Sequence, residues 1–192
     1  MLRTDRLILR PFEDSDLPRF SALNKDPVVM EHFTSPRSPA ETAKFMKTAN
    51  DEIHLRGYGL WALQVGDDGR FIGFTGLHHH EGTSYPFPCI EVGWRLHGDA
   101  WGQGYATEAA RAAIAHGLDM GVSDVVSFTI PQNSRSTAVM ERLGLTHDAA
   151  DDFDHPKLPK DSPLRHHVLY RLDIDAFTSR HRNDRLYSLI GV

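Results

Sequence analysis

One stretch, residues 90–120, constrains the fold more than any other part of the chain. It is typical of a strand over residues 90–96, a loop with two closely spaced glycines, and a helix that continues to about Met120. Gly102 and Gly104 let the backbone bend and approach a bound group without a Cβ in the way. Small and apolar residues recur along the predicted helix at the spacing of one buried face: Ala106, Ala109, Ala110, Ala113, Ile114, Gly117 and Leu118. The helix is therefore expected to lie close against a sheet.

The start of this helix is a candidate anion site. The first turn of a helix has free N–H groups and a partial positive charge, which suit a phosphate or a diphosphate. A strand, a glycine loop and an amphipathic helix also occur in many α/β proteins. The two glycines alone therefore leave both interpretations open.

The elements around this stretch predict a mixed sheet. Apolar runs over residues 60–65, 71–78 and 90–96 predict three antiparallel strands, the first two joined by a turn at residues 67–69. A helix links strand 90–96 to a further strand at 125–130, so these two should be parallel neighbours with a right-handed crossover.

Other segments complete the expected fold. Ser38 and Glu41 form a capping box that predicts a helix to about Arg56. Gly144 sits where a left-handed residue would end a helix over 134–143. The remaining expectations are a strand over 4–12, helices over about 14–24, 28–33 and 173–181, and a strand pair over 145–153 and 165–172. We expect one domain over residues 1–182 and a tail over 183–192 that docks on the domain or on a second subunit.

Composition excludes several classes of function. The net charge is −5 and the basic residues are scattered, which argues against a nucleic-acid binder. Cys89 is the one cysteine, so an intramolecular disulfide and a cysteine-based metal cage are excluded. No run of about 20 apolar residues predicts a membrane span, and the first residues lack the apolar segment of a signal peptide. A cytoplasmic location is expected.

Several motifs in order resemble one known family. They cover residues 4–11, 91–94, 101–109, 133–136 and 141–145. Together they resemble the GNAT superfamily of acyl-CoA-dependent N-acetyltransferases, and most of all its RimJ/RimL-like branch. The resemblance implies an α/β fold of the α+β type. Its mixed sheet would have about six to seven strands, mostly antiparallel with one splayed parallel pair, flanked by helices.

The resemblance also implies a binding site for acetyl-CoA as co-substrate. The family's phosphate motif, Arg/Gln-x-x-Gly-x-Gly/Ala, maps onto residues 101–106 and departs from the pattern at its first position, Trp101. The implied diphosphate ligands are the backbone amides of Gly102, Gln103, Gly104, Tyr105, Ala106 and Thr107. The pantetheine arm would lie along the edge of strand 90–96, where an N–H near Trp94, Arg95 or Leu96 would polarise the thioester carbonyl. Three arginines are candidates for the 3′-phosphate or are exposed helix charges: Arg111, Arg135 and Arg142.

Candidate catalytic residues follow from the same resemblance. The tyrosine acid of the wider superfamily is replaced by Met140, whereas the RimL-like pattern is met by Asn133 and Ser136. Asn133 would hold pantetheine or a water, and Ser136 would hydrogen-bond the sulfur as an acid; both residues are also ordinary at a helix start.

Glu91 is the first candidate base, or else a salt-bridged strand residue, and His78 and His80 are the alternatives. No metal is expected, because two histidines at i and i+2 without a clear third ligand fit a metal site poorly. Tyr58 and Trp61 are expected either to line the acceptor pocket or to pack in the core.

The acceptor is an amine whose identity the sequence leaves open. A protein α-amine has a pKa of about 7.7–8.0 and a lysine about 10.4, so an α-amine needs less help from a base. Since no certain base is visible, an α-amine or a small amine of low pKa is favoured. Loops at 30–40, 80–88 and 154–163 are expected to frame the acceptor mouth.

Two other functions stay open at this point, as does a homodimer. One is a catalytically silent acyl-CoA sensor. The other is a nucleotide-dependent oxidoreductase, for which Gly102, Gly104 and Asp124 provide a partial motif.

Overall fold

The computed structural model describes residues 1–66 and 68–190. The expected turn at residues 67–69 begins at Asp67, which lies outside the described residues. Among the helices of the described part, none is both long and apolar enough to cross a membrane.

The N-terminal third supplies two strands and one helical layer. The strands are β1 (Leu2–Arg3) and β2 (Leu7–Arg10), followed by a 3-10 turn, η1 (Asp14–Asp16), and the helices α1 (Leu17–Leu23) and α2 (Pro39–Arg56). The predicted capping box at the start of α2 is confirmed, since the Ser38 hydroxyl accepts from the Glu41 amide while the Glu41 carboxylate accepts from the Ser38 amide. Gly57, with φ of 78°, ends α2 in the left-handed conformation.

The middle of the chain is the predicted antiparallel meander followed by a crossover. The strands are β3 (Leu60–Val65), β4 (Phe71–His80) and β5 (Cys89–Leu96). A 3-10 turn, η2 (Gly98–Ala100), leads to α3 (Tyr105–Asp119) and then β6 (Val126–Thr129). β6 lies parallel to β5, as the helical connection predicts.

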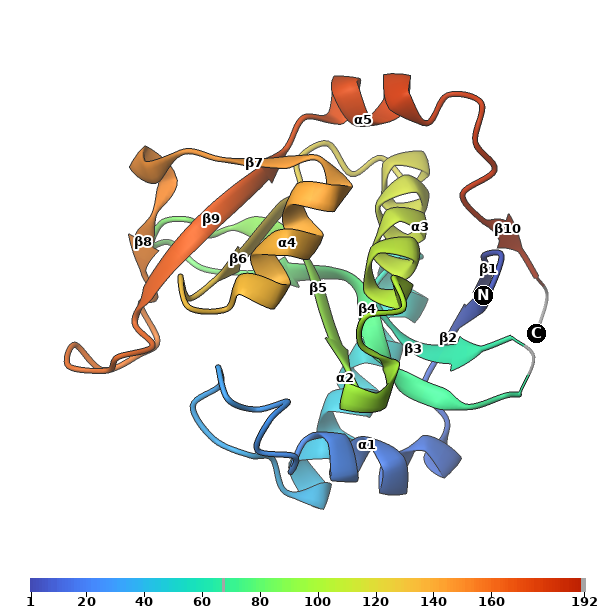
Figure 1. The fold of residues 1–192 in the computed structure, drawn as a ribbon, viewed down its shortest axis with the longest axis horizontal. Helices are drawn as coiled ribbons and strands as arrows, with labels where there is room; N and C mark the ends of the chain where they lie inside the picture. Colours follow the sequence, from blue (N-terminus) through green and yellow to red (C-terminus); the bar gives the residue numbers. More distant parts are fainter. Residues whose placement is uncertain (67, 191–192) are drawn as a thin grey trace.

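The C-terminal part covers the other end of the sheet. It comprises α4 (Ser134–Leu143), β7 (Leu145–His147), η3 (Ala149–Asp151), β8 (Phe153–Asp154), β9 (His166–Leu172), α5 (Ile174–Arg180) and β10 (Ser188–Leu189). Gly144 has φ of 88° and ends α4 as predicted. β10 pairs with β1, and Figure 1 shows the two side by side at one edge of the molecule.

The described residues form one ten-stranded sheet in the order β10-β1-β2-β3-β4-β5-β6-β9-β7, with β8 paired to β9. This exceeds the expected six to seven strands because β1, β8 and β10 contain only two residues each, too few to give a periodic signal. One strand pair in this sheet is parallel, which differs from the doubly wound sheet of dinucleotide oxidoreductases.

Helices cover both faces of the sheet. α1 and α2 pack on one face through a cluster that includes Phe20, Phe45 and Phe74. α3 packs on the other face, where Ala109 and Ala113 contact the meander strands. A Cβ on Gly117 would lie 2.1 Å from the Cδ1 atom of Leu77, so α3 approaches the sheet as closely as its small residues predict.

Three local predictions were wrong. Residues 28–33 form turns rather than a helix, because the Asp26 carboxylate accepts hydrogen bonds from the amides of Val28 and Val29. The strand expected over 4–12 forms only over Leu7–Arg10 (β2), because Thr4 lies in the connection between β1 and β2, where its side chain bonds to Leu7 and Glu108. The strand expected over 145–153 is interrupted by η3.

Candidate active site

The parallel strands β5 and β6 separate soon after they meet. They share a single pair of partners, Glu91 with Val126, and beyond that pair β6 bonds to β9 instead. In Figure 1 the two strands diverge below α4. The edge of β5 that faces this gap is partly bonded, because the Val92 carbonyl accepts from the Ser127 hydroxyl at 2.9 Å. Alternate residues of a strand share an edge, so the N–H of Trp94 points into the gap.

The loop ahead of α3 and the first turn of this helix present a row of unpaired backbone amides over residues 102–107, here called the amide cradle. Gly102 and Gly104 have φ of 74° and 78°, and Gly104 is the N-cap of α3. No described residue accepts a hydrogen bond from the amides of residues 102–107. The Thr107 hydroxyl is buried there without a partner. A diphosphate would satisfy these donors, because it brings several acceptor oxygens and a negative charge to a helix N-terminus.

A single cavity of about 1430 Å³ joins this cradle to the gap. Its walls include every residue predicted for catalysis or coenzyme binding except Gln103, among them Glu91, Trp94, Arg95, Leu96, Gly102, Gly104, Tyr105, Ala106, Thr107, Asn133, Arg135 and Ser136. The Gln103 side chain points elsewhere and donates to the Asp99 carbonyl at 3.1 Å. The predicted residues therefore meet in one place, although they come from β5, α3 and α4.

The cavity is richer in cations than the chain as a whole. Six arginines line it, namely Arg6, Arg37, Arg95, Arg111, Arg135 and Arg142, against three carboxylates, namely Asp5, Glu91 and Glu108. The whole chain has a net charge of −5. Such a concentration of positive charge favours a polyanionic ligand.

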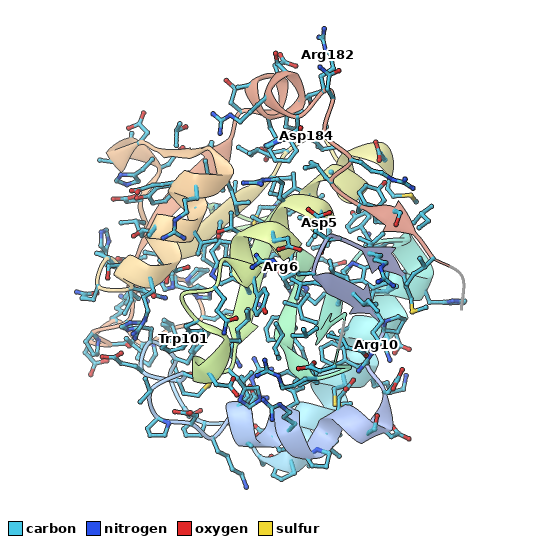
Figure 2. The ribbon with its side chains drawn as sticks, turned by 45° about the vertical axis from the view of Figure 1, so that its right-hand side comes forward. Asp5, Arg6, Arg10, Trp101, Arg182 and Asp184 are labelled. Carbon is cyan, nitrogen blue, oxygen red and sulfur yellow. The ribbon has the colours of Figure 1, made fainter. Side chains whose placement is uncertain are left out.

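Arg6 is a site residue that the sequence reasoning missed. Its guanidinium donates to the Gln103 carbonyl at 2.9 Å and pairs with Glu108 at 2.6 Å, and it lies over the Tyr105 ring. A Cβ on Gly104 would lie 3.5 Å from its Nη2 atom, so the cation stands at the rim of the amide cradle. Figure 2 shows Arg6 beside the start of α3. The contact joins residues about a hundred positions apart, and no local pattern signals it.

Trp101, which replaces the first residue of the family's phosphate motif, has a structural role in the loop. Its indole N–H donates to the Leu96 carbonyl at 2.9 Å and so joins the loop to the end of β5. The Arg135 guanidinium stacks 4.4 Å from the Trp101 ring centroid and pairs with Glu31 at 3.3 Å. Figure 2 shows Trp101 on the loop that leads into α3.

A chain of acid and imidazole groups runs from the wall of the cavity toward α2, and its members Glu91, His80 and His78 line the cavity. Glu91 Oε2 lies 2.6 Å from His80 Nε2, and the His80 ring lies 4.4 Å from that of His78. His78 Nδ1 in turn lies 3.2 Å from Glu52 Oε2. The three predicted base candidates, Glu91, His78 and His80, are therefore neighbours in one network. Within the part of the chain that the structure describes, no group of three or more metal-ligating side chains is placed to hold an ion.

Asn133 and Ser136 stand at the start of α4 on the opposite wall. The Asn133 side chain accepts from the Ser136 amide at 3.3 Å and donates to Thr129 Oγ1 at 3.0 Å, so it caps the helix. The hydroxyl of Ser136 donates to no described residue, although Ser136 lines the cavity. Met140 is fully buried in the core.

Tyr58 and Trp61 do not line the cavity, although one prediction placed them at the acceptor pocket. Trp61 is buried in the core on the α3 face and packs edge-on against His116, and Tyr58 packs against the neighbouring core cluster. Trp61 alternates along β3 with Leu60 and Ala62, which belong to the core under α1 and α2, so its side chain turns away from that side.

Two partly buried histidines lie at the far end of the cavity. His155 and His167 both line it, with ring centroids 5.2 Å apart and packed around Phe128 and Phe153. Burial lowers the pKa of His155, and the charge of His167 lowers it further. Burial is also the main cause that lowers the pKa of His167. The surroundings of both rings therefore favour the neutral form.

Comparisons with known proteins agree with this geometry. Residues 6–146 match the family described as acetyltransferase (GNAT) domain. An uncharacterized protein of Bacillus subtilis, YkkB, is 30% identical over 148 residues, which cover 75% of this chain and 84% of that protein. The FsC-acetyl coenzyme A-N(2)-transacetylase of Aspergillus fumigatus is 32% identical over 154 residues, which cover 76% of this chain and 65% of that protein.

A solved structure with the same fold provides a further comparison. The acetyltransferase from Agrobacterium tumefaciens has a TM-score of 0.71 and 31% identity, and the match covers 88% of this chain and 92% of that one. The family match spans most of the chain, and the amide cradle and the splayed strands lie within it. The chain therefore belongs to the GNAT family of N-acetyltransferases.

Proposed function

We propose that this chain transfers the acetyl group of acetyl-CoA to a primary amine, either a protein N-terminal α-amine or a small-molecule amine. One observation carries the proposal: the unpaired amides at the start of α3 open into the same cavity as the edge of β5 beyond Val92. A diphosphate on the former and an extended pantetheine arm along the latter would bring the thioester close to Trp94. The Aspergillus fumigatus relative is named for acetyl coenzyme A and for an N(2) acceptor, which supports both halves of the proposal.

The reaction needs positioning and two proton transfers. The amine nitrogen bonds to the thioester carbonyl carbon, the C–S bond breaks, the amine loses a proton and the thiolate gains one. The Trp94 N–H would stabilise the oxyanion, and the Ser136 hydroxyl would supply the proton to sulfur. Glu91, coupled to His80, would take the proton from the amine, directly or through water. Asn133 would hold the start of α4 in place beside the pantetheine arm.

We also propose that the enzyme belongs to the RimJ/RimL-like branch. The support is the motif pattern, with Asn133 and Ser136 at the start of α4 and the opening strand over residues 4–11. The arginines at the cavity rim, Arg111, Arg135 and Arg142, are the proposed partners of the coenzyme's 3′-phosphate. The Nε of Arg111 is buried without a partner among the described residues, which agrees with a ligand contact there.

A thiol-release assay tests the proposal. The purified protein is mixed with acetyl-CoA and a broad panel of amines, including N-terminal peptides, small amines and lysine derivatives. We expect CoA release well above hydrolysis with at least one α-amine or low-pKa amine. Acetyl-CoA should also raise the melting temperature, whereas NAD should not. Stabilisation by NAD alone would contradict the proposed donor.

A silent acyl-CoA sensor is the second candidate function. The observation that favours it is the buried Met140, which takes the place of the superfamily's tyrosine acid. The same assay separates the two candidates, because a sensor would bind acetyl-CoA and release no CoA with any amine of the panel.

A further inference from the structure

Arg95 is a buried cation without an anionic partner. The residue is 8% exposed, and its Nη1 donates to the Asn24 side-chain oxygen at 2.7 Å. Its Nε is buried without a hydrogen bond, and its Nη2 donates to no described residue. Arginine is almost never this buried unless it is paired with an acid. Nε and Nη2 together form the edge of a guanidinium that binds a carboxylate with two parallel hydrogen bonds.

The surroundings of Arg95 provide stacking but no negative charge. Its guanidinium carbon lies 3.9 Å from the Phe33 ring centroid and 5.6 Å from that of Phe74. The nearby charge that affects it is another cation, Arg37, which also lines the cavity. Burial lowers the pKa of Arg95 to about 9, and the repulsion from Arg37 adds to this effect. Burial also lowers the pKa of Arg37, and the nearby charge of Glu41 offsets only part of this effect. An anion bound between the two arginines would offset both the burial of their charges and the repulsion between them.

Arg95 faces the α1 and α2 side of the sheet, the same side as Glu91. Its cross-strand partner Phe74 belongs to the core under α1 and α2, whereas its neighbours Trp94 and Leu96 belong to the core under α3. Glu91 is on the same face of β5 as Arg95, four residues away, or about 13 Å along the strand. The proposed base and the arginines thus stand at two ends of one wall, a span that an amino acid with a long chain between amine and carboxylate, or the first residues of a peptide, would fill.

We propose that Arg95 and Arg37 bind a carboxylate on the acceptor, so that the preferred substrates are amines that carry a carboxylate. This inference rests on the proposed acetyl transfer. The carboxylate has two sources, a free amino acid or an acidic side chain near the N-terminus of a peptide.

Matched acceptors distinguish these sources. Initial rates are measured for ω-amino acids of increasing length against their amides, and for N-terminal peptides with Asp or Glu against Asn or Gln. In the wild type we expect KM for the carboxylate form to be about 10- to 100-fold lower than for the neutral form in at least one series. The series that shows the preference identifies the source.

Variants locate the preference. Arg95→Gln and Arg37→Gln should each remove most of the preference and leave KM for acetyl-CoA within about twofold of wild type. Arg37 is only partly buried, so Arg37→Gln keeps the test usable if Arg95→Gln fails to fold. Lys44→Gln, the same charge change at an exposed site on α2 outside the cavity, should behave as wild type.

Three results would overturn the inference: equal KM values for acid and amide in both series, an unchanged preference in Arg37→Gln, or a raised KM for acetyl-CoA in the arginine variants. The last result would assign the arginines to the coenzyme. A calorimetric titration with N-acetylated amino acids measures binding of the carboxylate without turnover, and so it tests the anion site separately from the proposed acetyl transfer. If no amine is acetylated but these carboxylates bind and Arg37→Gln abolishes the binding, the acetyl transfer fails and the anion site stands.

Discussion

The Glu91 carboxylate lies 2.6 Å from the His80 imidazole, across two antiparallel strands that form one wall of the cavity. The position of the His80 ring is fixed by packing, because the ring contacts Phe87 and Phe128 as well as His78. A carboxylate fixed in this way is oriented toward the cavity, which is the arrangement a general base requires.

Glu91→Gln should lower kcat about 10²- to 10³-fold, because the amide keeps the shape of the side chain but accepts no proton. KM for acetyl-CoA should stay the same, since Glu91 is on the acceptor face of β5. Glu141→Gln, at an exposed position of α4 outside the cavity, is the control. Steady-state kinetics with the best amine of the panel provide the measurement, and a kcat within about twofold of wild type would remove Glu91 from the role of base.

Ser136→Ala should lower kcat by about tenfold or more, because the departing thiolate would lose its proton donor. The helix cap should persist, since Asn133 bonds to the Ser136 amide and not to its hydroxyl. Thr137→Val, in the same turn but outside the cavity, is the matched control. A maximal rate equal to wild type would show that water or another group protonates the sulfur.

Gly102→Ala and Gly121→Ala form a pair that separates binding from stability. Both glycines have positive φ, 74° and 90°, and a Cβ on either would meet no atom within 4 Å. Each substitution should therefore reduce the free energy of unfolding by about 1 to 2 kcal/mol through backbone strain alone. Only Gly102→Ala should also weaken acetyl-CoA binding, by about tenfold, because relief of the strain turns the cradle amides away from the ligand. Calorimetric titration measures the affinities, and equal affinities in the two variants would contradict a diphosphate site at this loop.

The partly buried His155 and His167 predict a loss of stability in mild acid. Since the folded state lowers the pKa of His155 and of His167, the unfolded chain binds more protons below about pH 6.5. Their contribution to stability is complete above that pH and is lost as the pH falls through it toward the folded pKa values.

Urea unfolding at about pH 7.5 and about pH 5.5 measures this loss. The double variant with His155→Asn and His167→Asn should show a smaller difference between the two pH values than wild type. His54→Asn, at an exposed position of α2, should retain the wild-type difference. If the double variant retains it too, the pH dependence arises from other groups.

Local signals in the sequence predicted much of the fold. Ser38 with Glu41 fixed the start of α2, and Gly144 marked the end of α4, because these residues act on the backbone within one turn. The small face of α3 likewise predicted its close approach to the sheet at Gly117. Short-range chemistry of this kind does not depend on the rest of the fold.

Features that depend on distant partners could not be predicted in this way. The break between β1 and β2 comes from Thr4 bonding to Glu108. The turns after residue 26 have a local cause instead, because the Asp26 side chain competes with a helix for the backbone amides. Arg6 and Arg37 reach the cavity from segments with no binding motif of their own. Arg95 was placed at the site through its backbone N–H, whereas its buried, unpaired guanidinium became evident only with Asn24 and Phe33 around it.

Because β5 and β6 share a single pair of partners, the sheet is divided into two halves that are joined through the backbone at this one pair. Sheets elsewhere gain their rigidity from continuous ladders. Here the hydrogen bonds that are missing between β5 and β6 would be supplied by the coenzyme, which binds and leaves in every catalytic cycle. The two halves should accordingly fluctuate against each other between turnovers, and amide hydrogen exchange along the β5 edge should slow when the thioester arm completes the ladder.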